Sequence, residues 1–359
     1  MNKTERQQTA FLLGPERLEL RNVPVPEPGP GEILVRIGAA TTCGTDLKVY
    51  RRGGHPRMLR VPAAFGHEMA GTIAAVGRGA RRADGLAWRT GERVVVANSA
   101  PCGVCERCSR NHENLCTDLH YLNGAFSEYI LVPRRFAETS TYPCPDGLSF
   151  EIAALSEPLA CVLHGLETCA PEVLDRPSEI VIYGGGPIGL LFVDVLANAP
   201  GSGHHIVLAD PNLSRLEVGR RLGATEVVQV GREGGEAARL CSHSRGGDGY
   251  DLAIEATGSP AAWQDALASV RAGGTVQLFG GCPPGTTVPL DTHRLHYSEL
   301  TVKSAYHHRP ATFRRAIDLL ASGVLHPGAL LSGEHPLSEI EEAFRSMSRR
   351  EALKVVIRP

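Results

Sequence analysis

The most distinctive chemical feature of the sequence is a group of four cysteines with the spacing Cys102-x2-Cys105-x2-Cys108-x7-Cys116. Four thiolates this close together can form a tetrahedral site, which Zn2+ accepts without redox chemistry. An iron–sulfur cluster and two disulfides are the alternatives. The polar residues between the cysteines suit a small loop-like lobe better than a cluster, and a reducing compartment disfavours disulfides. Because a closed set of thiolates leaves no position for a substrate, the pattern predicts a structural zinc site.

A second feature is a glycine turn, Gly184-Gly185-Gly186-Pro187-Ile188-Gly189, which has the G-x-G-x-x-G spacing of a dinucleotide site. It follows an apolar run at 180–183 and precedes an apolar helical segment. Gly184 permits a tight turn, Gly186 lets the backbone approach a pyrophosphate at the helix N-terminus, and Gly189 allows close helix–strand packing. In a chain with 40 glycines the motif alone is weak, and a simple glycine-rich turn is the alternative.

An acidic residue strengthens the dinucleotide interpretation. Asp210 follows the next apolar run, 205–209, and stands 21 positions after Gly189, where a carboxylate can bind the adenosine ribose. A carboxylate there also repels a 2′-phosphate, so NAD is favoured over NADP. Arg215 could instead pair with that phosphate, although we prefer a stacking role on the adenine. We also count Thr257 among the expected cofactor-binding residues.

Three short motifs carry further candidate metal ligands. They are Cys43-Gly44-Thr45-Asp46, Phe65-Gly66-His67-Glu68 and Glu157-Pro158. Taken singly, each has an ordinary explanation. Cys43 could be a small buried apolar residue, His67 a core histidine with its hydrogen bonds satisfied, and Glu157 the start of a helix.

Together and in this order, the motifs resemble the zinc-containing medium-chain alcohol dehydrogenase superfamily over essentially the whole chain. The segment Gly124-Ala125-Phe126-Ser127-Glu128-Tyr129 contributes to the resemblance. The sorbitol, threonine and polyol dehydrogenase branch is the most similar, because Glu157 stands where many simple-alcohol enzymes have a cysteine.

The resemblance implies a second zinc site, which is catalytic. Cys43, His67 and Glu157 would bind this ion and leave the fourth position open. Glu68 would be a carboxylate that approaches or replaces a ligand during turnover. Asp46 would orient the histidine ligand and raise its basicity.

The resemblance also implies the reaction. The metal would lower the pKa of a secondary hydroxyl group, and hydride would pass to C4 of the nicotinamide. A polyol, a cyclitol or an aminocyclitol is the expected substrate, with a threonine-type hydroxy amino acid as the alternative. A zinc-free reductase of the same fold and a non-catalytic NAD- or zinc-binding relative are the rival classes; neither would keep all seven metal-site residues together with Thr45.

A proton relay is expected to begin at Thr45. Many relatives have a histidine where this sequence has Lys48. The ammonium group, bulk water or His55 could complete the relay instead, or Lys48 could be a solvated surface residue.

The surrounding pattern predicts an α/β protein of two domains. Short apolar runs separated by Gly and Pro fill residues 1 to about 150 and are typical of a β-rich barrel or sandwich. From 178 onward, strand-like and helical segments alternate, which predicts a doubly wound parallel sheet. We therefore expect a GroES-like catalytic domain (1–158 and 306–359, with a zinc lobe at about 98–120) and a Rossmann NAD-binding domain (159–305). The apolar run 353–357 could return to the first domain.

Composition narrows the partners and the location. Apolar residues make up 42% of the chain, charged residues 21%, and the net charge is −2, so nothing favours binding to nucleic acid or to an anionic membrane. The polar N-terminus lacks the apolar stretch of a secretory signal, and we expect a cytoplasmic protein. Residues 284–304, which include Val288, Leu290, Leu300 and Val302, are the expected sheet edge of a homodimer or homotetramer. The histidine-rich segments 291–297 and 306–308 are either a polar loop and strand end or a pocket wall.

Overall fold

The computed structural model describes residues 5–169, 171–198 and 203–359, which form two compact units. One unit comprises residues 1–160, 309–321 and 331–359, and the other comprises 161–308 and 322–330. Each has its own apolar core. The expected domain limits stay a prediction, because compactness alone does not define a domain.

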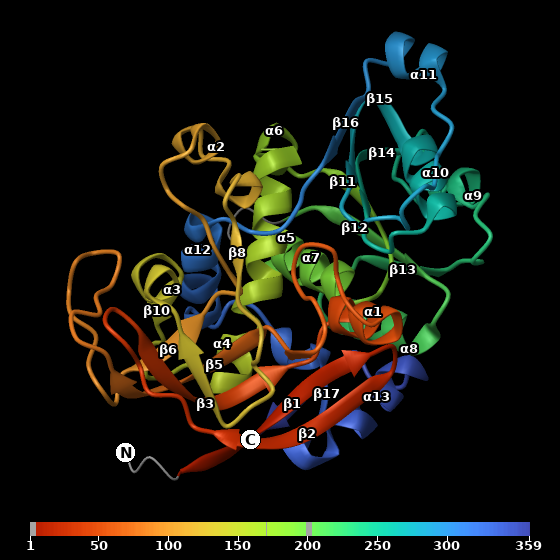
Figure 1. Cartoon of the computed structure of the whole chain (residues 1–359). Coiled ribbons are helices and arrows are strands. Elements are labelled where there is room, and N and C mark those ends of the chain that lie inside the picture. The colour runs from red at the N-terminus through yellow and green to blue at the C-terminus, as the bar shows by residue number, and fades with distance from the viewer. Residues whose placement is uncertain (1–4, 170, 199–202) are drawn as a thin grey trace. The chain divides into compact units, whose positions relative to one another are not determined.

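Antiparallel strands dominate the first unit (Figure 1). Its larger sheet has the order β10-β6-β5-β3-β18-β17, with β9 also paired to β3, and its smaller sheet has the order β2-β1-β4. The C-terminal strand β18 pairs antiparallel with β3 and parallel with β17. The strands are β1 (Arg6–Gly14), β2 (Arg17–Pro24), β3 (Ile33–Thr41), β4 (Ala63–Ala64), β5 (Glu68–Val76), β6 (Arg93–Val96), β7 (Ser99–Ala100), β8 (His120–Tyr121), β9 (Tyr129–Val132), β10 (Thr141–Pro143), β17 (Leu331–Pro336) and β18 (Lys354–Arg358).

Short helices join these strands, and an aromatic cluster fixes the core beneath them. The ring of Phe65 stacks on Phe344 with centroids 5.6 Å apart and meets Phe126 edge-on at 5.9 Å. Phe65 lies two residues before His67, so the cluster anchors the segment that carries this side chain. The helices are α1 (Gly44–Arg52), α2 (Glu106–Ser109), η1 (Glu113–Leu115), α3 (Arg134–Thr139), α4 (Phe150–Ala154), the start of α5 (Ser156–Cys169), α12 (Pro310–Ala321), η3 (Leu337–Glu339) and α13 (Ile340–Ser348).

The second unit is built on a six-stranded parallel sheet with the order β13-β12-β11-β14-β15-β16. Because the order runs outward in both directions from β11, the sheet is doubly wound, as predicted. Its strands are β11 (Glu179–Tyr183), β12 (His205–Asp210), β13 (Glu226–Gln229), β14 (Tyr250–Glu255), β15 (Val270–Leu278) and β16 (Thr301–Ser304).

Helices of the second unit pack against this sheet (Figure 1). Helices α7 and α8 contact strands β11 to β13, and α10 contacts β14 and β15. The helices are the remainder of α5, α6 (Pro171–Leu174), α7 (Pro187–Asn198), α8 (Leu213–Arg221), α9 (Ala237–Cys241), α10 (Pro260–Ser269), α11 (Thr292–Tyr297) and η2 (Pro327–Leu330).

Two sequence-based expectations in this unit were wrong in detail. The segment 291–297 is not a loop or strand end, because Asp291 caps a short helix, α11, by accepting a hydrogen bond from the Arg294 amide at 2.9 Å. The expected sheet edge at 284–304 is a strand only at Thr301–Ser304. Among the described residues, no helix has the length and apolar character needed to cross a membrane.

Candidate metal centres and cofactor site

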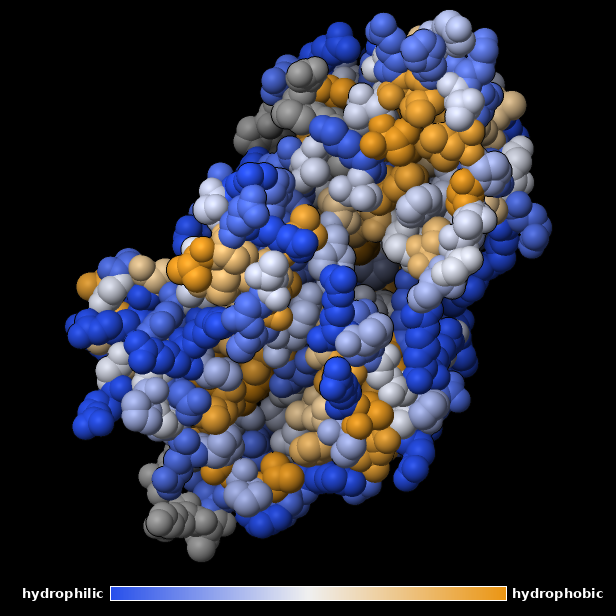
Figure 2. Space-filling model, turned by 45° about the horizontal axis from the view of Figure 1, so that its top comes forward, coloured by the Kyte–Doolittle hydropathy of each residue, from blue (hydrophilic) through white to orange (hydrophobic). Residues whose placement is uncertain are grey.

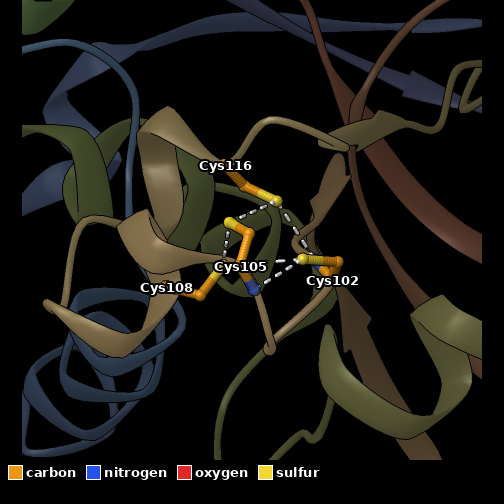
Figure 3. Close-up of side chains that lie close together, drawn as sticks. All are labelled: Cys102, Cys105, Cys108 and Cys116. Carbon is orange, nitrogen blue, oxygen red and sulfur yellow. Dashed lines mark hydrogen bonds between the residues drawn. The ribbon is translucent and has the colours of Figure 1, made fainter.

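The four predicted cysteines converge in one lobe of the first unit (Figure 3). The Cys105 sulfur lies 3.5 Å from that of Cys108 and 3.8 Å from that of Cys116, and the Cys102 and Cys108 sulfurs are 4.0 Å apart. Four thiolates about 2.3 Å from a tetrahedral zinc ion stand about 3.8 Å from one another. The same distances are far beyond a disulfide bond of about 2.05 Å. The lobe therefore fits zinc.

Backbone hydrogen bonds lower the pKa of the Cys102 and Cys105 thiols, whereas burial raises the pKa of the Cys108 and Cys116 thiols. The amides of Cys102 and Asp118 donate to the Cys116 sulfur, and the amide of Cys105 donates to the Cys102 sulfur, each at 3.3 Å. Hydrogen bonds from the backbone at Val104 and Cys105 lower the pKa of the Cys102 thiol. Because metals bind the thiolate, this arrangement favours metal binding.

Cys43 is placed by the start of helix α1. It is the residue that caps the helix: its sulfur accepts a hydrogen bond from the Thr45 amide at 3.3 Å, and its own amide donates to Asp46 Oδ2 at 3.1 Å. A helix N-terminus favours negative charge. The sequence Cys-Gly-Thr-Asp thus fixes the Cys43 side chain at the N-terminus of α1.

Asp46 also orients His67. The His67 Nδ1 atom lies 2.8 Å from Asp46 Oδ1, and both side chains are buried. Burial alone would lower the pKa of His67, but the charge and hydrogen bond of Asp46 raise it well above its ordinary value. With Nδ1–H donated to the carboxylate, Nε2 is the nitrogen that can bind a metal. Gly66 (φ +90°) allows this placement, because a Cβ atom there would lie 2.6 Å from Phe126.

Glu157 is buried at the start of α5. Its Oε1 atom accepts a hydrogen bond from the side-chain amide (Nδ2) of Asn98 at 2.9 Å. Burial raises the pKa of Glu157 to about 7, and Glu68 adds to this effect while His67 and Lys354 oppose it. The charges of His67, Glu68 and Lys354 therefore all act on the Glu157 carboxylate.

Glu68, the first residue of β5, is held by a buried cation. Its side chain is fully buried, and Lys354 Nζ lies 2.8 Å from Oε1 and 2.5 Å from Oε2. The Thr41 hydroxyl donates to Oε2. Burial by itself would lower the pKa of Lys354, but Glu68 raises it.

Cys43, His67 and Glu68 form one group, because their possible ligand atoms all lie within 4.8 Å of one another. The predicted third ligand, Glu157, is not a member of this group among the described residues. A thiolate, an imidazole and a carboxylate are nevertheless the donor types that zinc prefers. The site fits a metal ion, and the choice of Glu157 as the third ligand stays a prediction.

The expected relay residues lie on or after helix α1. Thr45 is half-buried in its first turn, and Lys48 is exposed one turn later. His55 follows the helix, and its Nδ1 atom lies 3.2 Å from the Arg57 amide and 3.1 Å from the Met58 amide. Burial, with Arg52 and Arg57, lowers the pKa of His55. The proposed relay roles of Thr45, Lys48 and His55 stay predictions.

In the second unit, the glycine turn joins β11 to α7. A Cβ atom on Gly189 would lie 1.8 Å from the Gly184 carbonyl oxygen, so the close packing expected there requires glycine. A Cβ atom on Gly186 would meet no atom within 4 Å. This open space beside the start of a helix is what a pyrophosphate group needs. The turn therefore fits a dinucleotide.

Asp210 ends β12 beside this turn. Its Oδ2 atom accepts a hydrogen bond from the Gly185 amide and its Oδ1 atom one from the Asn212 amide, both at 2.7 Å. Each carboxylate oxygen has a second lone pair that can accept a ribose hydroxyl. Arg215 is close by, since its Cβ atom lies 3.0 Å from where a Cβ atom of Gly185 would be.

Thr257 packs against the turn from the loop after β14. Its methyl carbon would lie 2.7 Å from a Cβ atom on Gly184, whose φ is +107°. The loop is fixed by buried Glu255, whose Oε1 atom accepts hydrogen bonds from the amide of Thr257 at 2.6 Å and the amide of Gly258 at 2.9 Å. Thr257 thus lies at the predicted site.

Three residues that shape these sites were not predicted from the sequence: Asn98, Glu255 and Lys354. Asn98 and Glu255 gave no signal, because isolated polar residues at strand ends are common. Lys354 did give one. It is the charged residue in the apolar run 353–357, where a strand with both faces buried leaves no exit for an ammonium group.

Comparisons with known proteins agree with this geometry. Residues 29–145 match the alcohol dehydrogenase GroES-like domain, and residues 187–322 match the zinc-binding dehydrogenase family. A sorbitol dehydrogenase of Bacillus subtilis is 32% identical over 99% of this chain and 98% of its own length. The chain belongs to the zinc-containing medium-chain alcohol dehydrogenases. It is an NAD-dependent oxidoreductase of the sorbitol and threonine dehydrogenase branch.

Two further relatives are similar over nearly the whole chain. An L-threonine 3-dehydrogenase of Chromobacterium violaceum is 28% identical over 95% of this chain and 96% of its own. A solved structure from Sinorhizobium meliloti, described as a zinc-binding dehydrogenase bound to NADP, superimposes with a TM-score of 0.87 at 29% identity, covering 99% of this chain and 100% of that one. The predicted fold class and reaction class are confirmed, and so is the prediction of a zinc-binding dehydrogenase that uses a nicotinamide cofactor.

Proposed function

We propose that this dehydrogenase oxidises a secondary hydroxyl group of a polyol, cyclitol or similar polar substrate, with NAD as the hydride acceptor. One observation carries the proposal: the possible ligand atoms of half-buried Cys43 and of buried His67 and Glu68 all lie within 4.8 Å of one another, and the charges of His67 and Glu68 act on the buried Glu157 carboxylate. An anionic, hydrogen-bonding site suits a substrate with several hydroxyl groups better than a plain alkyl alcohol. The similarity to a sorbitol dehydrogenase supports the same class.

In this proposal Cys43, His67 and Glu157 hold the catalytic zinc. The ion supplies Lewis acidity to the substrate hydroxyl when it is bound. Asp46 keeps the His67 ring in the orientation and tautomer that present Nε2. Asn98 holds Glu157 through its Oε1 atom and leaves Oε2 for the metal.

Thr45 is proposed to relay the proton that the substrate hydroxyl loses: its hydroxyl oxygen accepts that proton as its own hydroxyl proton passes to water. Its amide is fixed by the Cys43 sulfur, so the residue is tied to the ligand loop. Lys48 is one helical turn further on and exposed, and water at its ammonium group can take the proton onward. His55, with Nδ1 engaged by backbone amides, retains only Nε2 for such a role.

We propose that NAD is preferred over NADP. The buried Asp210 carboxylate lies at the edge of the glycine turn, where it would accept the ribose hydroxyls of NAD and repel a 2′-phosphate. Arg215, which packs beside Gly185, would stack on the adenine. The NADP bound to the Sinorhizobium meliloti protein makes NADP the necessary control.

We further propose a homo-oligomer formed through strand β16, and a cytoplasmic location. Strand β16 pairs with β15 on one side, and its four residues are exposed. Two apolar side chains that precede β16 in the chain are also exposed: Tyr297 is 73% exposed and Leu290 is 44% exposed. An exposed edge flanked by apolar side chains favours pairing with a second copy. A monomer in light scattering would contradict this.

The substrate proposal is tested by a screen for NADH production. Sorbitol, other polyols, cyclitols and aminocyclitols are compared with L-threonine and simple secondary alcohols, each with NAD and with NADP. The Cys43→Ala variant provides the background rate. We expect the highest kcat/KM with a polyol or cyclitol and NAD. Highest activity with L-threonine would select the hydroxy amino acid instead, and no reduction of NAD by any secondary alcohol would contradict the proposal.

A further inference from the structure

Five exposed cations lie close together on helix α1 and in the loop that follows it, a stretch we call the basic segment (residues 48–60). They are Lys48, Arg51, Arg52, Arg57 and Arg60. No acidic residue occurs between positions 47 and 67, and in the part of the chain that the structure describes none of the five forms an ion pair. Other exposed arginines do, since Arg134 pairs with Glu138 and Arg345 with Glu342.

Exposed charge alone is ordinary in this protein. Figure 2 shows hydrophilic residues spread over the face that it presents, with apolar residues in smaller patches between them. Arg51 and Arg52 also lie in the last turn of α1, where the helix dipole favours cations. The dipole does not account for Arg57 and Arg60, which lie beyond the helix. What distinguishes the basic segment is therefore a set of cations without counter-charges.

His55 lies within this segment and has a defined hydrogen-bonding state. Its Nδ1 atom accepts hydrogen bonds from the amides of Arg57 at 3.2 Å and Met58 at 3.1 Å. A nitrogen that accepts carries no proton, so the neutral ring has its proton on Nε2. Burial, with the charges of Arg52 and Arg57, lowers the pKa of His55, which keeps the ring neutral near neutral pH. Two guanidinium charges thus act on a ring that offers one N–H donor.

Helix α1 connects the basic segment to the proposed metal site. The helix begins directly after Cys43. Thr45, Lys48 and Arg52 follow at intervals of three and four residues, which places them on one face of the helix. The seven residues from Thr45 to Arg52 span about 10 Å along the axis. A sugar alcohol whose reacting hydroxyl group lies near Thr45 can therefore extend its other end toward the cations.

The loop after α1 is tied to the same site from the other side. The Met58 carbonyl oxygen accepts a hydrogen bond from Asn123 Nδ2 at 2.7 Å. The next amide, that of Gly124, donates to the Gly66 carbonyl oxygen at 2.9 Å, and Gly66 directly precedes His67. The fold thus attaches the basic segment to the segments of both Cys43 and His67.

We propose that Arg52, Arg57 and the Nε2–H group of His55 bind an anionic group, a carboxylate or a phosphate, on the polyol substrate. The inference rests on the proposed function and narrows its substrate class to polyols that carry a negative charge. A guanidinium group can donate two parallel hydrogen bonds to either anion, and the neutral ring adds a further donor. A neutral polyol would leave these cations without a counter-charge.

A matched substrate panel tests the proposal on the zinc-loaded enzyme with NAD. Sorbitol and mannitol are each compared with their 6-phosphates and with the corresponding sugar acids, gluconate and mannonate. We expect at least one anionic form to have a kcat/KM at least about 10-fold above that of its parent polyol, because hydrogen bonds to charged groups are the stronger ones. An anionic form that is not oxidised is measured as a competitive inhibitor, and its Ki should lie at least about 10-fold below the KM of the best neutral polyol. The phosphate and sugar-acid arms show which anion is bound.

Two pairs of substitutions locate the contact. Arg52→Gln with Arg57→Gln removes the two charges that act on His55, and Arg51→Gln with Arg60→Gln removes the same number of charges from the same segment. In the first pair, the preference for the anionic form over its parent polyol should fall by at least about 10-fold. In the second pair it should fall by no more than about 3-fold, and only at low salt, because only long-range attraction is lost.

The outcomes separate this inference from the proposed function. If neutral polyols are oxidised and no anionic form binds more tightly than its parent, the role of the basic segment is overturned and the proposed function stands. Equal losses in the two pairs of variants would also overturn it, because the preference would then come from the charge of the whole segment. If neither this panel nor the cyclitols yield NADH, the proposed function fails, and this inference fails with it.

Discussion

The two candidate metal sites of the first unit are built in opposite ways. In the lobe, all four sulfurs come from one short segment. Three of the sulfur–sulfur distances are 3.5 to 4.0 Å, and the sulfurs of Cys102 and Cys116 accept hydrogen bonds from nearby backbone amides. The other site combines Cys43, His67 and Glu68 from the ends of separate elements, with Glu157 on a further helix. It contains a thiol, an imidazole, carboxylates and a buried lysine.

The difference separates a site made by local spacing from a site made by the fold. A closed set of identical ligands can only hold an ion, which stabilises the lobe. A mixed set with more acidic groups than it needs can leave one position open, but it must then control which carboxylate binds. In this site the sheet places Lys354 of β18 against Glu68 of β5, so the carboxylate nearest to Cys43 and His67 is paired with a buried cation.

The largest effect is expected in the mixed site, which is the site that contains Cys43, His67 and Glu68. Cys43→Ala removes a proposed ligand of the catalytic zinc and should lower kcat/KM by about 10^3-fold or more. The melting temperature should change little, because Cys43 contributes to one helix cap and not to a closed metal lobe. Steady-state rates and thermal unfolding check both parts. A variant that keeps a tenth of its activity would contradict the assignment.

The matched change in the lobe should show the reverse pattern. Cys116→Ser removes one of four thiolates and should destabilise the protein by about 3 kcal/mol, since a structural zinc ion contributes folding energy directly. At temperatures well below unfolding, kcat/KM should stay within about 10-fold of the unaltered value, because the lobe supplies no reacting group. Denaturant unfolding and rates at low temperature test this; catalytic loss with unchanged stability would reverse the two roles.

A smaller effect is expected behind the mixed site. Asp46→Asn keeps the shape of the side chain but removes the charge that orients His67. Metal affinity should fall by about 10- to 100-fold, as for other partners of a histidine ligand. Competition with a chelator measures the affinity. The lobe provides the internal control, since its zinc should be retained in the same sample.

The smallest effect is expected at Lys48. The side chain is exposed on α1, and water can replace its ammonium group as a proton carrier. Lys48→Ala should change kcat by no more than about 3-fold, below the range of a general acid or base. The pH–rate profile is the decisive readout. An unchanged profile removes Lys48 from the mechanism, whereas a shifted one would extend the reactive part of the mixed site along α1.

The sequence predicted the fold class because its patterns are local. The glycine turn, the strand end at Asp210 and the alternation after residue 178 each describe a few neighbouring residues, and the doubly wound sheet has them in the expected places. Helix α11 was missed because one capping side chain, Asp291, outweighs a polar and histidine-rich composition. The sheet edge was predicted too long because α11 lies inside the expected range 284–304, which leaves only Thr301–Ser304 as a strand.

The candidate sites were predictable to different extents. The lobe could be predicted from spacing alone. Cys43 and His67 needed the resemblance to known dehydrogenases. The pairing of Lys354 with Glu68 depends on β18 returning beside β3, a contact between residues 286 positions apart. Such a pairing could not be predicted from the spacing of either residue, although a lysine in an apolar strand indicated that some partner must exist.

The central claim is that one chain holds two zinc ions in these two different sites. Elemental analysis of the purified protein and of the Cys43→Ala and Cys116→Ser variants tests it most directly. We predict two zinc ions per chain in the unaltered protein and loss of one in each variant, with activity following only the ion lost with Cys43. A single ion that disappears with Cys116 and is unaffected by Cys43, or no zinc at all, would contradict the account.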